Sequence, residues 1–435
     1  MRVQNFSRFN SKTIGTLTQN QIEKVAKTTG FQMRNRGKLN AFVLIQSFMS
    51  VLVHRSKSYQ DWAMCLSGII QTSVSKQAVS RRLNEKFALT LKSLLKNVIT
   101  YKVQNKVRVE LFKSFRTVWI QDSTTLHLPD AATVLFNGNV SRGKQKSVAK
   151  LNIVLNLLNG SIPVMDWYSF TDNEQKIASQ NLSVVKRGDL LIRDLGYFVL
   201  SSFEKLAQEG VFFLSRMRYG VNLYDSNTHK PINLLALLGA QKTIDVEVLC
   251  GKNKSLKVRL VALKLSAEQA NNRVRKAKQD RDKRMNHNKT YYKLLQYVIF
   301  ITNVKQDRWT PQQVANAYRS RWNIEIIFKS WKSGLHIPHI IPDVTINIYR
   351  IECILYLILL YLSWFQQKIY MPLKWDRQIC KTGLSIIRLI KLLFMKPHIW
   401  LFQSQIPQKV LHEIKYYCCY DLRYDRVNSF KFICN

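Results

Sequence analysis

Residues 310–334 read TPQQVANAYRSRWNIEIIFKSWKSG and predict one long helix with both ends marked. Thr310 is an N-cap residue, Pro311 occupies the first helical position, and Gln313 completes a capping box. Gly334 stands where a left-handed C-cap closes a helix. The faces of this helix therefore predict where the core and the polar groups beside it lie.

Four polar side chains recur along one border of the predicted helix. At roughly 100° per residue they fall within an arc of about 60°, and they are Tyr318, Arg321, Glu325 and Lys332. The adjacent arc is apolar and is expected to face the core; it holds Ala317, Ile324, Ile327, Phe328 and Trp331. A hydroxyl, a guanidinium, a carboxylate and an ammonium thus line the edge of the buried face.

The role of Glu325 stays open when the helix is taken alone. In one interpretation it is a solvated carboxylate that pairs with Lys329 four residues later. In the other it binds a metal ion, while Arg321, Lys329 and Lys332 hold phosphate groups beside it.

The chain is strongly basic. Its 435 residues include 67 Lys and Arg against 27 Asp and Glu, which gives a net charge of +40. That excess in a chain of ordinary apolar content indicates a polyanionic partner rather than a ribosome-associated or membrane-surface role. The longest apolar run, Cys353 to Phe365, has 13 residues and is too short to cross a bilayer. Seven scattered cysteines without zinc-site spacing fit reduced thiols.

Residues 1–107 predict a helical DNA-binding domain. Ser75 would cap a short helix whose outer face carries Lys76, Gln77 and Arg81. This segment is typical of the second helix of a helix-turn-helix, whose polar side chains reach base edges. An ordinary basic amphipathic helix has the same pattern, so both interpretations stay open.

Residues 108–218 change to strand-like periodicity. The expected strands are 115–121, 126–129, 148–158, 162–168, 189–193 and 211–216, with helices at 178–186 and 201–209; Ser201 and Glu204 would form a capping box on the second. An Asn159-Gly160 turn joins two of these strands into a hairpin. This order predicts an α/β fold with an RNase H-like mixed sheet.

Two aspartates are expected just past strand ends, where such a sheet presents its site. These are Asp122 and Asp194, preferred over Asp130, Asp166 and Asp189, which fall in a loop, inside a strand and before a strand. Taken singly, each is equally well explained as a turn residue.

Residues 219–290 predict a β-rich basic insertion, with a hairpin at 243–265 and a basic helix at 266–286. The helix carries Arg273, Arg275 and Arg281 with few compensating acids, so it is expected to follow phosphates rather than form a solvated face. Residues 291–345 return to the core, where 291–302 is expected to be a strand, and 346–435 form a C-terminal helical domain.

The motif Tyr318-x2-Arg321-x3-Glu325-x6-Lys332 resembles the Y-R-E-K signature of bacterial DDE transposases of the insertion-sequence-four family. Asp122-Ser-Thr and Asp194-Leu-Gly-Tyr resemble the family's two aspartate motifs, except that Leu195 stands where the family usually has Arg. The resemblance implies that Asp122, Asp194 and Glu325 are catalytic metal ligands.

Three carboxylates at one sheet edge repel each other, so two Mg²⁺ ions, or Mn²⁺ as a substitute, are expected to bind there. The resemblance implies a DNA transposase that acts as a homodimer on terminal inverted repeats and target DNA. It further implies a cytoplasmic, nucleoid-associated bacterial protein that does not bind membranes. A non-catalytic DNA-binding regulator and an RNase H-like nuclease are the alternatives.

Overall fold

A computed structural model describes residues 13–14, 17–33, 38–54, 56, 58–100, 109–141, 143–180, 182–239, 241–279, 288–334, 347–375, 383–395 and 407–420. Outside the β1–β2 hairpin (Thr13–Ile14 and Leu17–Thr18), its strands are β3 (Val118–Leu128), β4 (Asn137–Ser141), β5 (Lys144–Asn156), β6 (Val164–Ser169), β7 (Leu190–Arg193), β8 (Phe212–Arg216), β9 (Leu223–Asp225), β10 (Thr243–Cys250), β11 (Leu256–Lys264) and β12 (Tyr297–Thr302).

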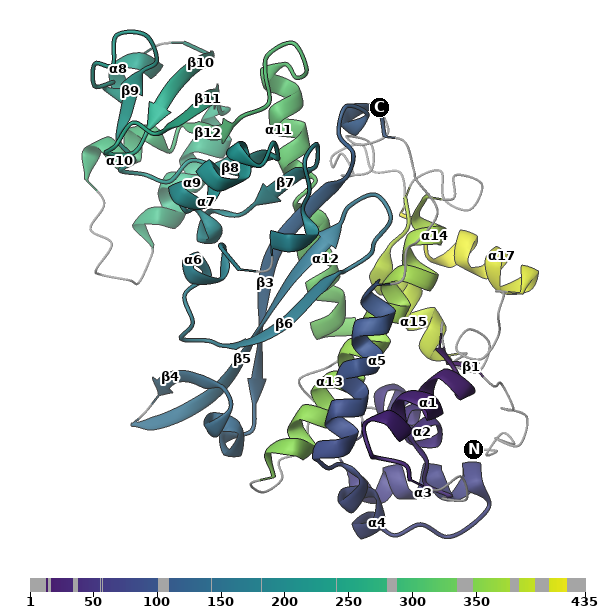
Figure 1. The fold of residues 1–435 in the computed structure, drawn as a ribbon. Helices are drawn as coiled ribbons and strands as arrows, with labels where there is room; N and C mark the ends of the chain where they lie inside the picture. The colour runs from purple at the N-terminus through teal and green to yellow at the C-terminus, as the bar shows by residue number, and fades with distance from the viewer. Residues whose placement is uncertain are drawn as a thin grey trace.

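The strands from β3 to β12 form one mixed sheet in the described residues (Figure 1). The order is β4-β5-β3-β7-β8-β12-β11-β10-β9, and β6 pairs with β5. Strands β7 and β8 run parallel to β3, whereas β5 runs antiparallel to it. The predicted hairpins β5–β6 and β10–β11 are both present, and β12 joins the second of them to the central strands.

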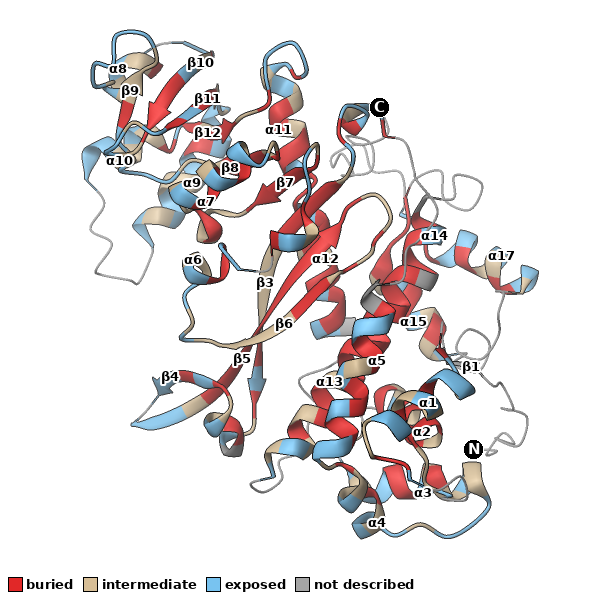
Figure 2. Ribbon diagram, in the orientation of Figure 1, coloured by how far each residue is buried: buried red, intermediate tan, exposed pale blue. Residues whose placement is uncertain are grey.

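Alternation along β3 sends its side chains into two different cores. Ile120 packs with the helices of both chain ends, whereas Trp119 packs under α7 (Leu200–Gln208) with Phe203. Central strands are buried on both faces, as the red segments of Figure 2 show. The sheet is therefore covered on both sides where β3 and β7 meet.

Helices from the two chain ends lie together on one side of the sheet (Figure 1). The N-terminal helices are α1 (Gln19–Thr28), α2 (Ala41–His54), α3 (Tyr59–Ile70), α4 (Lys76–Arg82) and α5 (Glu85–Thr100); the C-terminal helices are α13 (Ile348–Trp364), α14 (Met371–Trp375), α15 (Ile386–Met395) and α17 (Gln408–Tyr417). Helices α5 and α13 pack against each other in a single shared core.

The remaining helices surround the sheet and its β-rich extension, which consists of β9, β10, β11 and β12. They are α6 (Glu174–Ile177), α8 (Leu234–Leu238), α9 (Ala267–Lys278), α10 (Lys289–Leu294), α11 (Pro311–Arg319) and α12 (Trp322–Lys329). Residues 291–294 belong to α10, so the strand expected from residue 291 begins only at Tyr297. The Asn288 side chain caps α10 and starts a helix there.

Two expected local features around α6 and α7 are wrong. The capping box at Ser201 and Glu204 is absent, because α7 begins one residue earlier, after Val199, which has no capping side chain. The helix expected over 178–186 is absent from the described residues of that range. The short α6, capped by Asn173, ends at Ile177, and a 3-10 turn follows at Leu182–Val184.

The C-terminal apolar helix is longer than its 13-residue apolar run. The helix Ile348–Lys374 has 27 residues. It is this long because a π-helical stretch, which includes the polar residues Gln366 and Gln367, connects α13 to α14 without a break. By length and composition this helix is long enough to cross a membrane, contrary to the sequence-based estimate. However, 72% of its most apolar window is buried inside the fold, where a core helix has the same composition.

The cysteines also depart from expectation at one position. Cys65, Cys250, Cys353 and Cys418 are free, but Cys419 is disulfide-bonded. The prediction that all thiols are reduced is therefore wrong. An odd cysteine count excludes complete pairing of the cysteines, but it does not exclude a single disulfide bond.

Candidate active site

The strand register places Asp122 and Asp194 next to each other. The parallel pairing of β3 and β7 ends with Gln121 opposite Arg193, and one aspartate directly follows each of these residues. Asp194 follows the end of β7, as predicted. Asp122 lies inside β3, contrary to prediction, because β3 continues its pairing with β5 as far as Leu128. The two carboxylates still share the edge where the parallel pairing stops.

The long helix predicted over 310–334 is interrupted twice. Its start is confirmed, with the capping box of Thr310 and Gln313 in place. It then divides into α11, α12 and a π-helical turn at Ser330–Gly334. At the first break, backbone amides donate to carbonyls three residues back, and Ser320 Oγ donates to the Ala317 carbonyl at 2.6 Å. Because of these tighter turns, the four polar side chains do not lie along one border of a single regular helix, as was expected.

Arg321, at the break between α11 and α12, is the centre of the site. Its Nη1 donates to Asp122 Oδ2 at 3.0 Å, and its Nη2 donates to Glu325 Oε1. Its Nε lies 3.7 Å from Asp194 Oδ1 and has no hydrogen-bond partner. Carboxylates from β3, the end of β7 and α12 therefore converge on one guanidinium whose side chain is 9% exposed.

The pairing of Glu325 distinguishes its two interpretations. Its ion pair is with Arg321, one turn earlier, and no Glu325–Lys329 pair forms in the described structure. The solvated Glu325–Lys329 pair is therefore wrong.

Burial is the largest influence on the pKa of Asp122. It raises the pKa of Asp122 to about 7, although Arg321 and the Ser123 amide act in the opposite direction. Asp194 and Glu325 raise it further by repulsion. Tyr318 donates its hydroxyl to Asp194 Oδ1 at 3.1 Å, and burial raises the pKa of this phenol. One arginine thus leaves three neighbouring acids incompletely neutralised.

The other predicted cations of the helix make no hydrogen bond or ion pair with the carboxylates in the described residues. Lys329 and Lys332 are exposed, and Lys332 belongs to the π-helical turn. No ion pair joins either lysine to an acid within the described residues. The structure thus brings together Tyr318, Arg321 and Glu325 but not Lys332.

The predicted DNA-contacting residues elsewhere lie on two helices. Lys76, Gln77 and Arg81 are exposed on α4, whose Ser75 cap and buried Val79 match the prediction. On α9, Arg275 is exposed, whereas Arg273 donates to the Tyr297 carbonyl at 2.7 Å and its pKa is lowered by burial. Arg281 lies outside the described residues.

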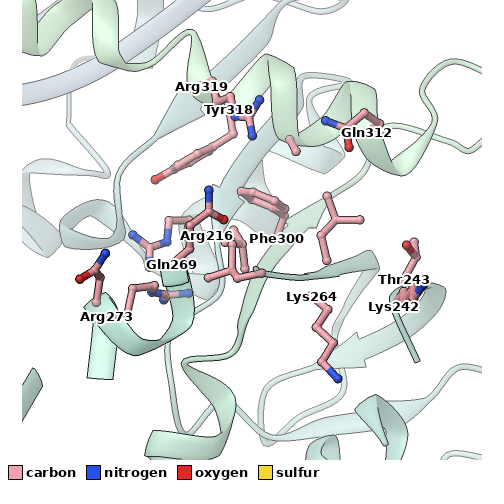
Figure 3. Close-up of a pocket in the computed structure, with 15 residues that line it drawn as sticks. Arg216, Lys242, Thr243, Lys264, Gln269, Arg273, Phe300, Gln312, Tyr318 and Arg319 are labelled. Carbon is pink, nitrogen blue, oxygen red and sulfur yellow. The ribbon is translucent and has the colours of Figure 1, made fainter. Parts of the chain in front are cut away.

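A basic cavity of about 680 Å³ opens beside the carboxylates, between the β-rich extension and α11 (Figure 3). No acid lines it among the described residues, and its cations are Arg216, Lys242, Lys264, Arg273 and Arg319. The rings of Phe300 and Tyr318 line it as well, with centroids 5.2 Å apart. Because Tyr318 also bonds to Asp194, the cavity adjoins the acidic site.

Sequence reasoning missed the cavity cations and one acid. Apart from Arg273, none of these cations belongs to a predicted site. Arg216 and Lys264 lie on strands, Lys242 precedes β10, and Arg319 ends α11. Glu174 accepts a hydrogen bond from Ser123, the neighbour of Asp122, at 2.6 Å. These two residues are 51 positions apart, so no local pattern links them.

Residues 113–340, just over half of the chain, match the family model described as Transposase DDE domain. The transposase for insertion sequence element IS231F of Bacillus thuringiensis subsp. israelensis is 27% identical over 314 residues, covering 67% of this chain and 65% of the relative. The transposase for insertion sequence element IS1151 of Clostridium perfringens is 28% identical over 363 residues, covering 78% and 75%. The chain therefore spans slightly less than two thirds of the first relative's length.

A solved structure, the piggyBac transposase synaptic complex with hairpin DNA, has a TM-score of 0.43 and 9% identity. The match covers 94% of this chain and 83% of the piggyBac transposase chain. A score at this level supports no further assignment.

Proposed function

Because the chain belongs to the insertion-sequence transposases with a DDE domain, we propose that it cuts DNA at transposon ends and joins them to target DNA. The observation that carries this proposal is the convergence of Asp122, Asp194 and Glu325 on one cation at one edge of the sheet. This reaction is cut-and-paste transposition.

The strand order supports an RNase H-like core for this activity. Strands β6, β5, β3, β7 and β8 are neighbours in that order, with the last two parallel to β3. The segment from β9 to α9 lies between Asp194 and Glu325 in the chain, as a β-rich insertion would. The domains are 1–107, 108–218, 219–290, 291–345 and 346–435, with the Y-R-E-K helix in the fourth.

The residues present fit a divalent metal site. All donors are carboxylate oxygens, the ligands that Mg²⁺ and Mn²⁺ prefer. No three potential metal-ligating side chains group closely enough to share an ion in the described structure, because Arg321 stands between the acids. Binding therefore requires the Arg321 guanidinium to withdraw.

Asp122, Asp194 and Glu325 would hold two Mg²⁺ ions, for which Mn²⁺ substitutes. When bound, these ions supply Lewis acidity at the attacking and leaving oxygens of the phosphodiester.

Other side chains of the protein would orient the carboxylates and hold the phosphates of the DNA. Tyr318 orients Asp194 through its hydroxyl, and the withdrawn Arg321 would hold a phosphate flanking the scissile bond. Lys332 would bind a neighbouring phosphate from its exposed turn, completing the Y-R-E-K set. No side chain is assigned as a covalent nucleophile.

The surface around this site suits double-stranded DNA. The basic cavity adjoins Tyr318, and its positive charge would attract the strand that enters the site. Arg273, Arg275 and Arg281 would contact phosphates from α9 and beyond. On α4, Lys76, Gln77 and Arg81 would read the terminal inverted repeats.

We expect a homodimer in the complex that holds two transposon ends, acting in the bacterial cytoplasm at the nucleoid. This part of the proposal rests on the family.

The test is an assay with duplex DNA from the boundaries of the genetic element that encodes the chain. The protein is incubated with this DNA and Mg²⁺, next to the variant Asp194→Ala. We expect cut ends and joined products with the native protein and neither with the variant. Cutting without joining would indicate a nuclease, and binding without cutting would indicate a regulator; either would overturn the proposal.

A further inference from the structure

Glu174, at the start of α6, lies between the two aspartate motifs of the site. It is half-buried and comes from a segment that supplies no other group to the carboxylate cluster. Its two carboxylate oxygens face different motifs.

The first contact is with the Asp122 motif. Ser123 Oγ donates to Glu174 Oε1 at 2.6 Å, a short charge-assisted hydrogen bond. The backbone amide of the same serine donates to Asp122 Oδ1 at 2.8 Å. A single residue thus links the Glu174 carboxylate to the Asp122 carboxylate.

The second contact is with the Asp194 motif. A Cβ atom added to Gly196 would lie 2.1 Å from Glu174 Oε2, so this carboxylate rests against the turn that follows Asp194. Gly196 does not have a positive φ, unlike Gly188 and Gly210. The space taken by Glu174, rather than the backbone conformation, therefore explains a glycine at this position.

Tyr197 extends this contact across the sheet. Its hydroxyl donates to Asn152 Oδ1 at 2.9 Å, and Asn152 pairs with Ser123 in the β3–β5 ladder. Burial raises the pKa of the Tyr197 phenol, so it stays a neutral donor. The turn after Asp194 is thus fixed to β5 at the position where Glu174 contacts β3.

We propose that Glu174 is a positioning residue that clamps the Asp122 and Asp194 motifs at the separation needed to bind divalent metal. This rests on the proposed function. Glu174 acts through Ser123 and Gly196 and does not itself bind the metal. Outer groups of this kind contribute about 10–100-fold to metal affinity or activity.

The test is a double-mutant cycle with Glu174→Ala, Gly196→Ala and the combined variant. Mn²⁺ affinity is measured by electron paramagnetic resonance, and DNA-end cleavage is measured in parallel. Each single variant should weaken both by about 10–100-fold, the first by removing the clamp and the second by displacing it. The combined variant should lose no more than Glu174→Ala alone, since the new methyl group then meets no carboxylate.

Two further variants separate positioning from folding. Glu174→Gln retains an acceptor for Ser123 and should recover most of the Mn²⁺ affinity. Glu209→Ala removes an exposed glutamate at the end of α7 and should leave it unchanged. All variants are compared by thermal unfolding, and those that unfold early are measured below their transition.

The outcomes distinguish this proposal from the proposed function. Losses that simply add in the combined variant, or full affinity in Glu174→Ala, would overturn the clamp alone. A native protein that neither binds Mn²⁺ nor cuts DNA would overturn the transposase assignment instead.

Discussion

The carboxylates at the two ends of the β3–β7 strand pair differ in how completely they are paired with cations and hydrogen-bond donors. At the end where β7 begins, Asp189 is fully buried and accepts two hydrogen bonds from Arg116, at 2.8 and 2.7 Å. Trp119 Nε1 and the Lys186 amide donate to the same carboxylate. One acid thus has one arginine and every donor it needs.

At the other end, three acids share one arginine. Arg321 contacts Asp122 and Glu325, and it lies 3.7 Å from Asp194. The side chains of Asp194 and Glu325 are each 37% exposed, whereas that of Asp189 is 0% exposed. The number of cations per acid, and not burial alone, therefore distinguishes the fully paired Asp189 from the three acids that share Arg321.

The largest expected effect is on catalysis at the underpaired end. Glu325→Gln should slow DNA-end cleavage at least about a thousandfold, because a neutral amide binds divalent metal poorly; that loss corresponds to about 4 kcal/mol. DNA affinity, measured by gel shift, should change little. If binding and cleavage fall together, Glu325 is not a metal ligand.

The matching change at the satisfied end should affect folding instead. Asp189→Asn removes the charge that Arg116 and two N–H donors share, and it should lower the free energy of unfolding by about 2–4 kcal/mol. Urea titration measures this loss. Asp130→Asn, which breaks only the exposed pair with Lys146, is the control and should cost less than about 1 kcal/mol. Equal losses of stability in the two variants would contradict a structural role for the buried Asp189 carboxylate.

Removing Arg321, the cation that the three acids share, should increase the affinity of the site for divalent metal. In the DNA-free protein, Arg321→Ala should bind Mn²⁺ about tenfold more tightly, because three carboxylates lose their internal counterion. Lys205→Ala, at an exposed site on α7, controls for net charge. Weaker Mn²⁺ binding in Arg321→Ala would mean that the arginine organises the acids more than it competes for them.

The last expected effect is a pH dependence of stability. Burial raises the pKa of Asp122 to about 7, so the folded, metal-free protein favours the protonated acid. The stabilising contribution is complete below about pH 4, the unfolded value, and is lost as pH rises through 7. At about 1.4 kcal/mol per pKa unit, Asp122→Asn should therefore exceed the native protein in stability by up to about 4 kcal/mol at pH 8 and match it at low pH. Urea midpoints with chelator check this, and a difference that is constant with pH would contradict it.

Local patterns predicted the parts of the fold that short-range physics decides. The hairpins β5–β6 and β10–β11 follow from alternation and turn residues, and the start of α11 follows from Thr310 and Gln313. The same reasoning placed Asp122 and Asp194 at one sheet edge and rejected Asp189.

Long-range contacts explain what the sequence did not predict. The break at Ser320 lets Arg321 reach Asp122, which lies 199 positions away, and no helical periodicity encodes that contact. Asp122 lies within a strand because β5 continues to pair with it. Glu174 was missed since its role depends on the space beside Gly196, which only the folded chain defines.

The most direct test of the account maps the bound metal on the protein. Fe²⁺ with ascorbate and peroxide generates hydroxyl radicals at a Mg²⁺ site, and these cut the nearby backbone. We predict cuts near Asp122, Asp194 and Glu325 that excess Mg²⁺ suppresses, with none near Asp189. Mg²⁺-sensitive cuts that cluster elsewhere, and spare all three of these positions, would contradict it.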